Sequence, residues 1–363
     1  MKVAIMGAGL SGLTCAIMLE RHGIKPTIFE SRTQVGDRFI NGEAFLSLLT
    51  RPINDSFQYL SDEYQLYLRP TGSINQIIIN SENEQASIKE HVGFVNIRGR
   101  HKLSLEAQLA EQVKSDILFN SKHSYEELLQ EYSHVIMATG DAEYAMKLQN
   151  FREDLSVSLK GATIEGNFDR FSVLVWLDNT MAPKGYGYLL PFSDTEANIV
   201  IAHPDLQEGQ EELVTKFWER FYDRVCSELG QTLRITDQFQ IHNYKLGICK
   251  SARIGNTFFT GNCFGSAMPF LGFGQFAAIL TGIYAAYDLC GYGKYEDYTK
   301  ILKKSYDYSL TLRRGMEHLT NQNFDFIVKH LNGYVGDKLF RPSKHNPLKT
   351  LSYLVRPFIK KER

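Results

Sequence analysis

The sequence predicts an α/β protein in which a parallel sheet is interrupted by an inserted antiparallel sheet and followed by a helical tail. Three observations support this fold class. The apolar run Val3–Met6 leads into closely spaced glycines and a helical pattern, which is typical of the start of a βαβ unit. Residues 171–177, 185–192 and 196–203 are β-rich runs separated by turn residues, and they indicate a meander. Residues 257–289 return to strand, glycine loop and small-residue helix.

These sequence patterns predict two domains, each formed from separate stretches of the chain. The parallel, nucleotide-binding domain is expected to comprise residues 1–54, 95–150 and 245–300. The antiparallel substrate domain is expected to comprise residues 55–94 and 151–244, including an amphipathic helix near residues 211–230. Residues 301–363 are predicted to form a helical C-terminal region.

Composition excludes several classes of protein. With 40 Lys and Arg, 41 Asp and Glu and a formal net charge of −1, the chain lacks the basic excess of a nucleic-acid binder. Its 5 cysteines show neither metal-ligand spacing nor a disulfide framework, which favours a reducing cytoplasm. No apolar run approaches the roughly 20 residues of a membrane span. At 43% hydrophobic residues, the chain can form a sizeable core.

The first glycine cluster, Gly7, Gly9 and Gly12, has the spacing G-x-G-x-x-G. The first glycine permits a tight turn, the second a close approach to a pyrophosphate, and the third close packing of helix on strand. The helix that follows would direct its N-terminal amides at the phosphate. Glu30 ends the second predicted strand, where a carboxylate accepts hydrogen bonds from ribose hydroxyls and repels a 2′-phosphate. This pattern predicts a Rossmann-like site for FAD or NAD; a glycine turn without a ligand is the alternative.

The second glycine cluster distinguishes between these nucleotides. A strand leads into Gly261 and Asn262, and Pro269, Gly272 and Gly274 precede a helix rich in small residues. A second helix N-terminus behind a glycine turn forms a second anion site. Two such sites in one domain favour a ligand long enough to reach both, with its pyrophosphate at the first helix and its flavin ring near the second. We therefore expect FAD.

The chain resembles the FAD-dependent oxidoreductases of the glutathione-reductase-like fold, a group that includes the aromatic-ring hydroxylases and the geranylgeranyl reductases. Residues 135–141 are similar to their strand-then-glycine motif below the adenine. Residues 261–274 match the reductases' G-D-x-x-G-x-x-x-P-x-x-G-x-G without a gap, and residues 183–192 resemble their P-G-G-Y-x-W-x-F-P. Departures from these patterns include Asn262 for Asp, Phe273 for a polar residue, Tyr188 for Trp and Leu190 for Phe.

The predicted cofactor site combines the two glycine turns, the residues around Glu30 and the strand-then-glycine motif. Arg38 is a candidate pyrophosphate contact, and the resemblance implies a second arginine near the FAD phosphates, with Arg100 preferred to Arg98. A solvated loop is the alternative for each arginine. The predicted cofactor-binding residues are Gly7, Ala8, Gly9, Leu10, Ser11, Gly12, Glu30, Ser31, Arg32, Arg38, Arg100, Thr139, Gly140, Gly261, Asn262, Pro269, Gly272, Phe273 and Gly274.

The resemblance implies a reaction in which reduced flavin delivers hydride from N5 to a carbon–carbon double bond of an apolar, prenyl- or lipid-like substrate. The predicted substrate-binding residues are Tyr186, Tyr188, Leu190, Phe270 and Phe273, and Tyr188 is a candidate proton donor. Core packing is the alternative for the two tyrosines, which alternate on one strand face. Cys263 is interpreted as a small buried residue without redox chemistry.

The sequence leaves three questions open. The electron donor is NAD(P)H, bound transiently, or a ferredoxin, because the chain has one dinucleotide fingerprint. The function has two alternatives: an FAD-dependent monooxygenase that uses NAD(P)H and oxygen, and a non-catalytic protein that binds prenyl groups. Residues 351–363 mix apolar and basic side chains, which fits peripheral contact with an anionic membrane or a merely solvated tail.

Overall fold

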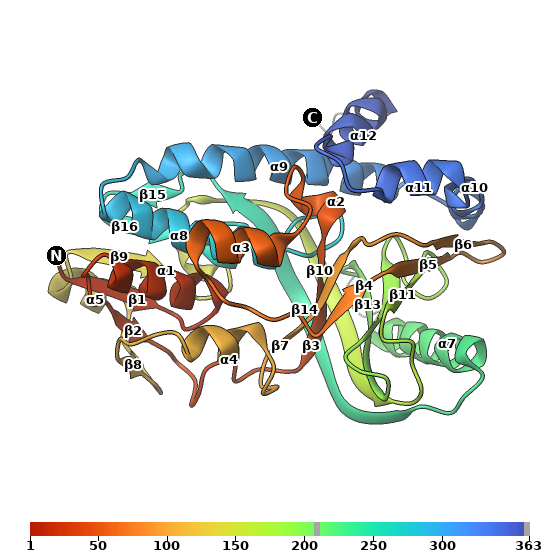
Figure 1. Ribbon diagram of the computed structural model, residues 1–363, viewed down its shortest axis with the longest axis horizontal. Helices are drawn as coiled ribbons and strands as arrows, with labels where there is room; N and C mark the ends of the chain where they lie inside the picture. The colour runs from red at the N-terminus through yellow and green to blue at the C-terminus, as the bar shows by residue number, and fades with distance from the viewer. Residues whose placement is uncertain (207–210, 359–363) are drawn as a thin grey trace. The chain divides into compact units, whose positions relative to one another are not determined.

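Figure 1 shows a computed structural model of the chain, which describes residues 1–206 and 211–358. The chain divides into two compact units. The first comprises residues 1–38, 99–155 and 245–310, and the second comprises residues 39–98, 156–244 and 311–363. Residues 39–54 and 95–98, which the sequence analysis assigns to the nucleotide-binding domain, therefore fall in the second unit. The expected C-terminal region is divided between the units at residue 310.

The first unit is built on a six-stranded sheet with the order β15-β16-β9-β1-β2-β8. Every neighbouring pair in the described sheet is parallel except β15 and β16. Its central strands are buried, as expected for a parallel sheet whose strands are uninterrupted apolar runs. The strands are β1 (Val3–Met6), β2 (Thr27–Phe29), β8 (Ile117–Leu118), β9 (His134–Met137), β15 (Arg253–Ile254) and β16 (Thr257–Phe259).

Two helices of the first unit pack with their backbones in close approach. They are α1 (Leu10–Arg21) and α8 (Gln275–Leu289), the helices that follow the two glycine clusters. A Cβ atom at Gly282 of α8 would lie 2.2 Å from the carbonyl oxygen of Ser11, so only glycine fits at this crossing. The remaining helices within this unit are α4 (Leu105–Ala110), α5 (Tyr125–Glu131) and α6 (Glu143–Lys147).

The second unit contains a seven-stranded sheet, in the order β14-β10-β13-β12-β11-β5-β6, and a three-stranded sheet, in the order β3-β7-β4. The predicted meander is confirmed, since β11, β12 and β13 pair antiparallel in sequence order. The strands are β3 (Asn41–Leu46), β4 (Gly72–Ile74), β5 (Gln76–Asn80), β6 (Gln85–Ile88), β7 (Gly93–Arg98), β10 (Phe151–Glu165), β11 (Ser172–Trp176), β12 (Tyr186–Pro191), β13 (Glu196–Pro204) and β14 (Arg234–Cys249). Strands β10 and β14 begin or end in the first unit.

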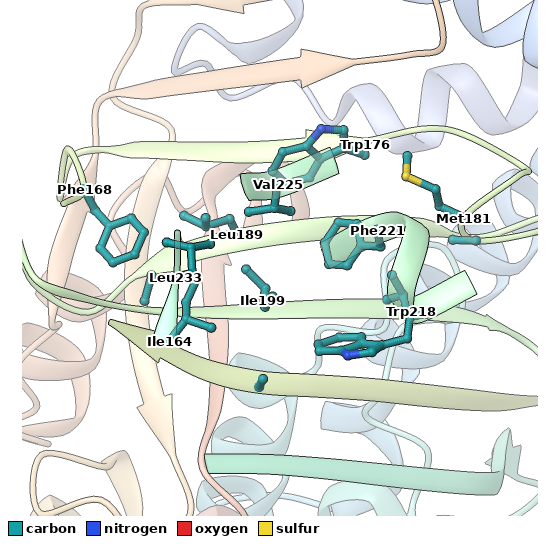
Figure 2. Packing of buried hydrophobic residues seen from close by; sticks show 14 residues of the cluster. Ile164, Phe168, Trp176, Met181, Leu189, Ile199, Trp218, Phe221, Val225 and Leu233 are labelled. Atoms are coloured by element: carbon teal, nitrogen blue, oxygen red, sulfur yellow. The ribbon is translucent and has the colours of Figure 1, made fainter. Parts of the chain in front are cut away.

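Helix α7 (Glu211–Leu229) covers one face of the seven-stranded sheet. Figure 2 shows Phe221 and Trp218 of α7 among the side chains of the sheet, with Trp176 edge-on to Phe221 at 5.4 Å between ring centroids. A Cβ at Gly187 would lie 2.5 Å from the Phe221 ring, so this glycine lets the helix approach. Because side chains alternate along β12, Tyr186 and Tyr188 lie on the face opposite α7.

A buried arginine of the second unit binds the C-terminal end of one helix and the loop that follows it. Arg51, which follows α2 (Ser47–Thr50), is 6% exposed. Its Nη2 donates to the carbonyl oxygens of Phe340, at 3.0 Å, and Arg341, at 2.7 Å, which end α11 (Tyr334–Phe340). A guanidinium thus satisfies the orphan carbonyls of a helix C-terminus. The other helices here are α3 (Ser56–Tyr64), α10 (Asn321–Leu331) and α12 (Pro347–Val355), while α9 (Tyr295–Met316) runs from the first unit into the second.

We expect Arg51→Met to lower the free energy of unfolding by about 2 kcal/mol, because it leaves buried carbonyls without a donor. Denaturant titration followed by circular dichroism measures the change. Lys344→Met is the matched control at an exposed position of the adjoining loop, and it should change the free energy by no more than about 0.5 kcal/mol. Equal losses in the two variants would contradict the anchoring role.

Candidate functional site

The predicted cofactor residues cluster at one edge of the parallel sheet of the first unit. Gly7 directly follows β1 and Glu30 directly follows β2, while Thr139 and Gly261 each come two residues after the ends of β9 and β16. Since β1, β2, β9 and β16 run parallel, their carboxyl ends meet at the same edge. Ligands of open α/β sheets bind at this edge.

The glycines of the first turn have separate physical roles. Gly7 has φ +114°, and a Cβ there would lie 2.3 Å from the carbonyl oxygen of Ala138. A Cβ at Gly12 would lie 2.1 Å from the carbonyl oxygen of Gly7, so this glycine is required for packing α1 against the turn. At Gly9 no atom of the described chain lies within 4 Å of a Cβ. The space beside Gly9 is therefore open to a ligand.

The N-terminus of α1 is available to an anion. Gly9 occupies the N-cap position, and among the described residues no side chain caps the helix and no acidic residue lies in its first turn. The first-turn amides of a helix need an external acceptor, and the helix dipole favours a negative one. A pyrophosphate meets both requirements.

Glu30 is held in place by the backbone on both sides of it. Its Oε2 accepts the Ala8 N–H at 2.8 Å, and its Oε1 accepts the Arg32 N–H at 3.0 Å. The carboxylate therefore joins the turn after β1 to the loop after β2. The Ser31 hydroxyl also donates to Oε1, at 3.4 Å, while the second lone pair of Oε2 can accept a hydrogen bond from a ribose hydroxyl.

The second glycine turn lies directly against the first turn of α1. Gly261 has φ +59°, and a Cβ there would lie 2.6 Å from Ser11 Oγ. The Thr260 hydroxyl, immediately before this turn, lies 3.2 Å from Ser11 Oγ. The two glycine clusters, about 250 residues apart in the chain, thus meet at one side chain. This adjacency is the geometric requirement for a single ligand that reaches both turns.

The loop from Gly261 to Gly274 folds back on itself before α8 begins. Asn262 Oδ1 accepts from Ser266 Oγ at 2.8 Å, and a Cβ at Gly274 would lie 2.4 Å from the Ser266 carbonyl oxygen. Gly272 has φ +71° and open space around its Cβ position. Like α1, α8 begins at a glycine without a side-chain cap or a first-turn acid in the described chain.

Sequence reasoning missed Gln275, the first residue of α8. This side chain is 2% exposed, yet its Nε2 has no hydrogen-bond partner among the described residues. An unsatisfied buried amide at the end of the cofactor loop fits a site that is completed by a ligand. Glutamine was overlooked because it falls just outside the glycine motif.

The predicted arginines are divided between the two units. Arg38 and Arg100 both lie in the first unit, where the Arg100 N–H donates to the Arg38 carbonyl oxygen at 3.2 Å. Arg32 donates from Nη1 to the Asp37 carbonyl oxygen at 2.9 Å. Arg98 ends β7 in the second unit, with its Nη1 3.4 Å from Glu43 Oε1. The structure thus gives Arg98 a protein partner, while phosphate contacts of Arg38 and Arg100 stay predictions.

The predicted substrate residues also come from both units. Tyr186 and Tyr188 of the second unit are buried side by side, 5.9 Å between ring centroids. The Tyr188 hydroxyl donates to the Gly42 carbonyl oxygen at 3.3 Å, and burial raises the pKa of both tyrosines. Phe270 belongs to the first unit, where its N–H donates to Ser309 Oγ at 2.9 Å. A cavity shared by these residues with Leu190 and Phe273 stays a prediction.

Cys263 lies within the loop from Gly261 to Gly274 but does not have the properties of a reactive thiol. It is buried, and burial raises its pKa to about 12. A thiol that stays protonated at neutral pH is a poor nucleophile.

Comparisons with known proteins agree with this geometry. A model of the NAD(P)-binding Rossmann-like domain matches residues 5–44. No curated protein matches the sequence. A geranylgeranyl bacteriochlorophyll reductase-like protein from Thermoplasma acidophilum has a similar structure, with a TM-score of 0.75 and 15% identity over 99% of this chain and 98% of that one.

Two further solved structures have similar folds. A flavoprotein/dehydrogenase from Cytophaga hutchinsonii has a TM-score of 0.62 and 16% identity over 99% of this chain and 100% of that one. A flavin-dependent brominase has a TM-score of 0.66 and 13% identity over 99% of both chains. The α/β fold with an inserted antiparallel sheet, which the sequence predicts, is confirmed, and it is a fold shared with flavoproteins.

Two glycines of the first turn differ in whether the fold leaves room for a side chain, and alanine substitutions test this difference. We expect Gly12→Ala to lower the free energy of unfolding by about 2 kcal/mol or more, because the methyl group collides with backbone. Gly9→Ala meets open space at a negative φ and should change it by no more than about 0.5 kcal/mol. Denaturant titration of both variants tests this, and a loss at Gly9 as large as that at Gly12 would contradict the assignment.

Proposed function

We propose that the chain is an FAD-dependent oxidoreductase that reduces a carbon–carbon double bond of an apolar, prenyl- or lipid-like substrate. The observation that carries the proposal is the contact of Gly261 with Ser11, because it brings the second glycine turn against the first turn of α1, whose N-terminus has no side-chain cap. A mononucleotide would use only one of these turns. The gapless match of residues 261–274 to the reductase motif supports the same cofactor.

The residues of the first unit fit FAD. The amides that follow Gly9 would hold the pyrophosphate, and Glu30 would hold the ribose hydroxyls of the adenosine. The loop at Gly272 and the start of α8 would hold the flavin end, where Gln275 offers an unsatisfied donor. When bound, FAD supplies hydride transfer from its N5 position. A helix N-terminus near the flavin favours an anionic reduced form by about 1 kcal/mol.

The second unit supplies residues suited to an apolar substrate. Tyr186, Tyr188 and Leu190 share the face of β12 opposite α7, so their side chains offer an aromatic and aliphatic surface. Burial keeps the Tyr188 hydroxyl protonated, and the Gly42 carbonyl fixes its position. We propose Tyr188 as the group that protonates the second carbon of the reduced double bond.

The absorbance spectrum of the purified protein tests the cofactor. We expect a flavin spectrum, and we expect Glu30→Gln to weaken FAD binding about 10-fold or more, because a carboxylate accepts stronger hydrogen bonds than an amide. Glu131→Gln, at an exposed position at the end of α5, is the matched control and should bind FAD like the unaltered chain. A colourless protein that takes up no FAD would favour the non-catalytic prenyl binder instead.

Turnover without oxygen tests the reaction. Protein reduced with NAD(P)H or with a ferredoxin should be reoxidised anaerobically by a prenyl substrate, and Tyr188→Phe should slow this step about 100-fold. Tyr222→Phe is the matched control, since the Tyr222 hydroxyl also donates to a backbone carbonyl of the second unit, that of Leu233, at 2.7 Å. Equal rates in the two variants would exclude Tyr188 as the proton donor.

A strict requirement for oxygen would identify the protein as a monooxygenase. This alternative has support of its own, because a flavin-dependent monooxygenase solved with FAD and substrate has a similar fold, with a TM-score of 0.56 and 13% identity. Consumption of oxygen together with NAD(P)H and substrate is the measurement that selects it.

We also propose peripheral contact of the C-terminal helices with an anionic membrane. Tyr353 and Leu354 of α12 are 52% and 63% exposed, and Lys349 on the same helix is exposed. Residues 359–363, the most basic part of this segment, lie outside the described residues. None of the described helices is long and apolar enough to cross a bilayer.

Flotation with vesicles tests this contact. The full chain should float with vesicles that contain phosphatidylserine and remain behind with uncharged ones. Replacement of both Tyr353 and Leu354 by Ser should reduce the floating fraction several-fold, because two apolar anchors are lost. Flotation independent of these residues would contradict the proposal.

A further inference from the structure

The second unit contains a buried guanidinium that its protein partners do not fully satisfy. Arg313, near the end of α9, is 4% exposed. Its Nε lies 3.0 Å from Glu317 Oε1, whereas its Nη2 is buried and has no hydrogen-bond partner among the described residues. Buried charged groups normally have all their donors paired, because an unpaired one is costly.

The ion pairs of this guanidinium leave a net positive charge within the cluster of Arg313, Arg314 and Glu317. Glu317 is shared, since its Oε2 lies 3.5 Å from Arg314 Nη1. One carboxylate therefore faces two cations. Arg313 is the buried one of the two, while the Arg314 side chain is 33% exposed and can be screened by solvent.

Tyr186 and His203 both experience the charge of Arg313, and the carboxylates of Glu43 and Asp205 act on the same two groups. Tyr186 begins β12, and its partner in the antiparallel ladder, Ala202, precedes His203 on β13. Burial and the charge of Arg313 both lower the pKa of His203, which keeps the ring neutral at pH 7. Burial raises the pKa of Tyr186 against the opposing effect of Arg313, so this hydroxyl also stays neutral.

We propose that Arg313 anchors a buried subsite for an oxyanion, a carboxylate or a phosphate group, at the Tyr186 end of β12. An oxyanion accepts the unpaired Nη2–H, and it neutralises the excess positive charge of the Arg313, Arg314 and Glu317 cluster. The ligand is either a free oxyanion or the polar end of an amphiphile whose apolar part contacts the aromatic face of β12. The inference depends on the second unit alone, so it stands or falls independently of FAD binding.

Calorimetric titration of the full chain separates the two sources. The probes are inorganic phosphate, acetate, decyl phosphate, decanoate and, as the uncharged reference, decanol. We expect at least one oxyanion to bind 10-fold or more tightly than decanol. Binding by phosphate or acetate alone identifies a free-oxyanion site, and binding by only the decyl anions identifies an amphiphile. Two results would overturn the proposal. Decanol could bind as tightly as its anionic counterparts, or no anion could bind with a dissociation constant below 10 mM, which is roughly the limit for a useful charge-assisted contact.

Three variants test whether the preference for an oxyanion over decanol depends on this cluster. Arg313→Gln should abolish the preference for the anion and leave decanol binding unchanged, whereas Arg314→Gln, the matched control, should retain most of it. Glu317→Gln should strengthen anion binding several-fold, because it removes the competing carboxylate. A purely structural arginine predicts no such gain, so this variant keeps the test decisive if Arg313→Gln folds poorly. Unaltered anion affinity in both Arg313→Gln and Glu317→Gln would refute the subsite.

Discussion

The close approach of α1 and α8 is the constraint on which the candidate cofactor site depends. The backbone of α8 at Gly282 lies against Ser11, and the turn at Gly261 lies against the hydroxyl of the same residue. A Cβ atom at Gly282 would collide with the main chain of α1, so the spacing of the helices is set there by backbone and not by adjustable side chains. The uncapped N-terminus of α1 and the turn at Gly261 are thereby held next to each other before any ligand arrives, which reduces the ordering that binding requires.

Local signals in the sequence were sufficient for the start of the first unit. The strand, glycine turn and helix around Gly9 and the acidic end of β2 could be read within 30 residues of sequence, because each element depends on neighbours in the chain. Glu30 was correctly placed at the end of β2, but its hydrogen bond with Ala8 could not be read from the sequence. The adjacency of Gly261 and Ser11 was inferred only through the demand for a single long ligand.

The second unit was less predictable because its organisation depends on pairings distant in sequence. Residues 39–54 look polar and loop-like, yet β3 forms there because it pairs with β7, and Asn198 holds it by accepting the Gly42 N–H at 3.0 Å. The choice between Arg98 and Arg100 likewise needed the register of β7, which ends at Arg98. One departure from the reductase motif has a local explanation, since the hydroxyl of Tyr188 donates to the Gly42 carbonyl.

Each unit is assembled from three separate stretches of the chain, and this arrangement has a consequence for biosynthesis. One edge of strand β9 pairs with β1, and its other edge pairs with β16, which follows more than 110 residues later in the chain. During translation the apolar edge of β9 therefore emerges from the ribosome long before its neighbour exists. Such delayed pairing slows folding and exposes strand edges to other nascent chains, so this protein should rely on chaperones during synthesis more than a protein with contiguous domains of the same length.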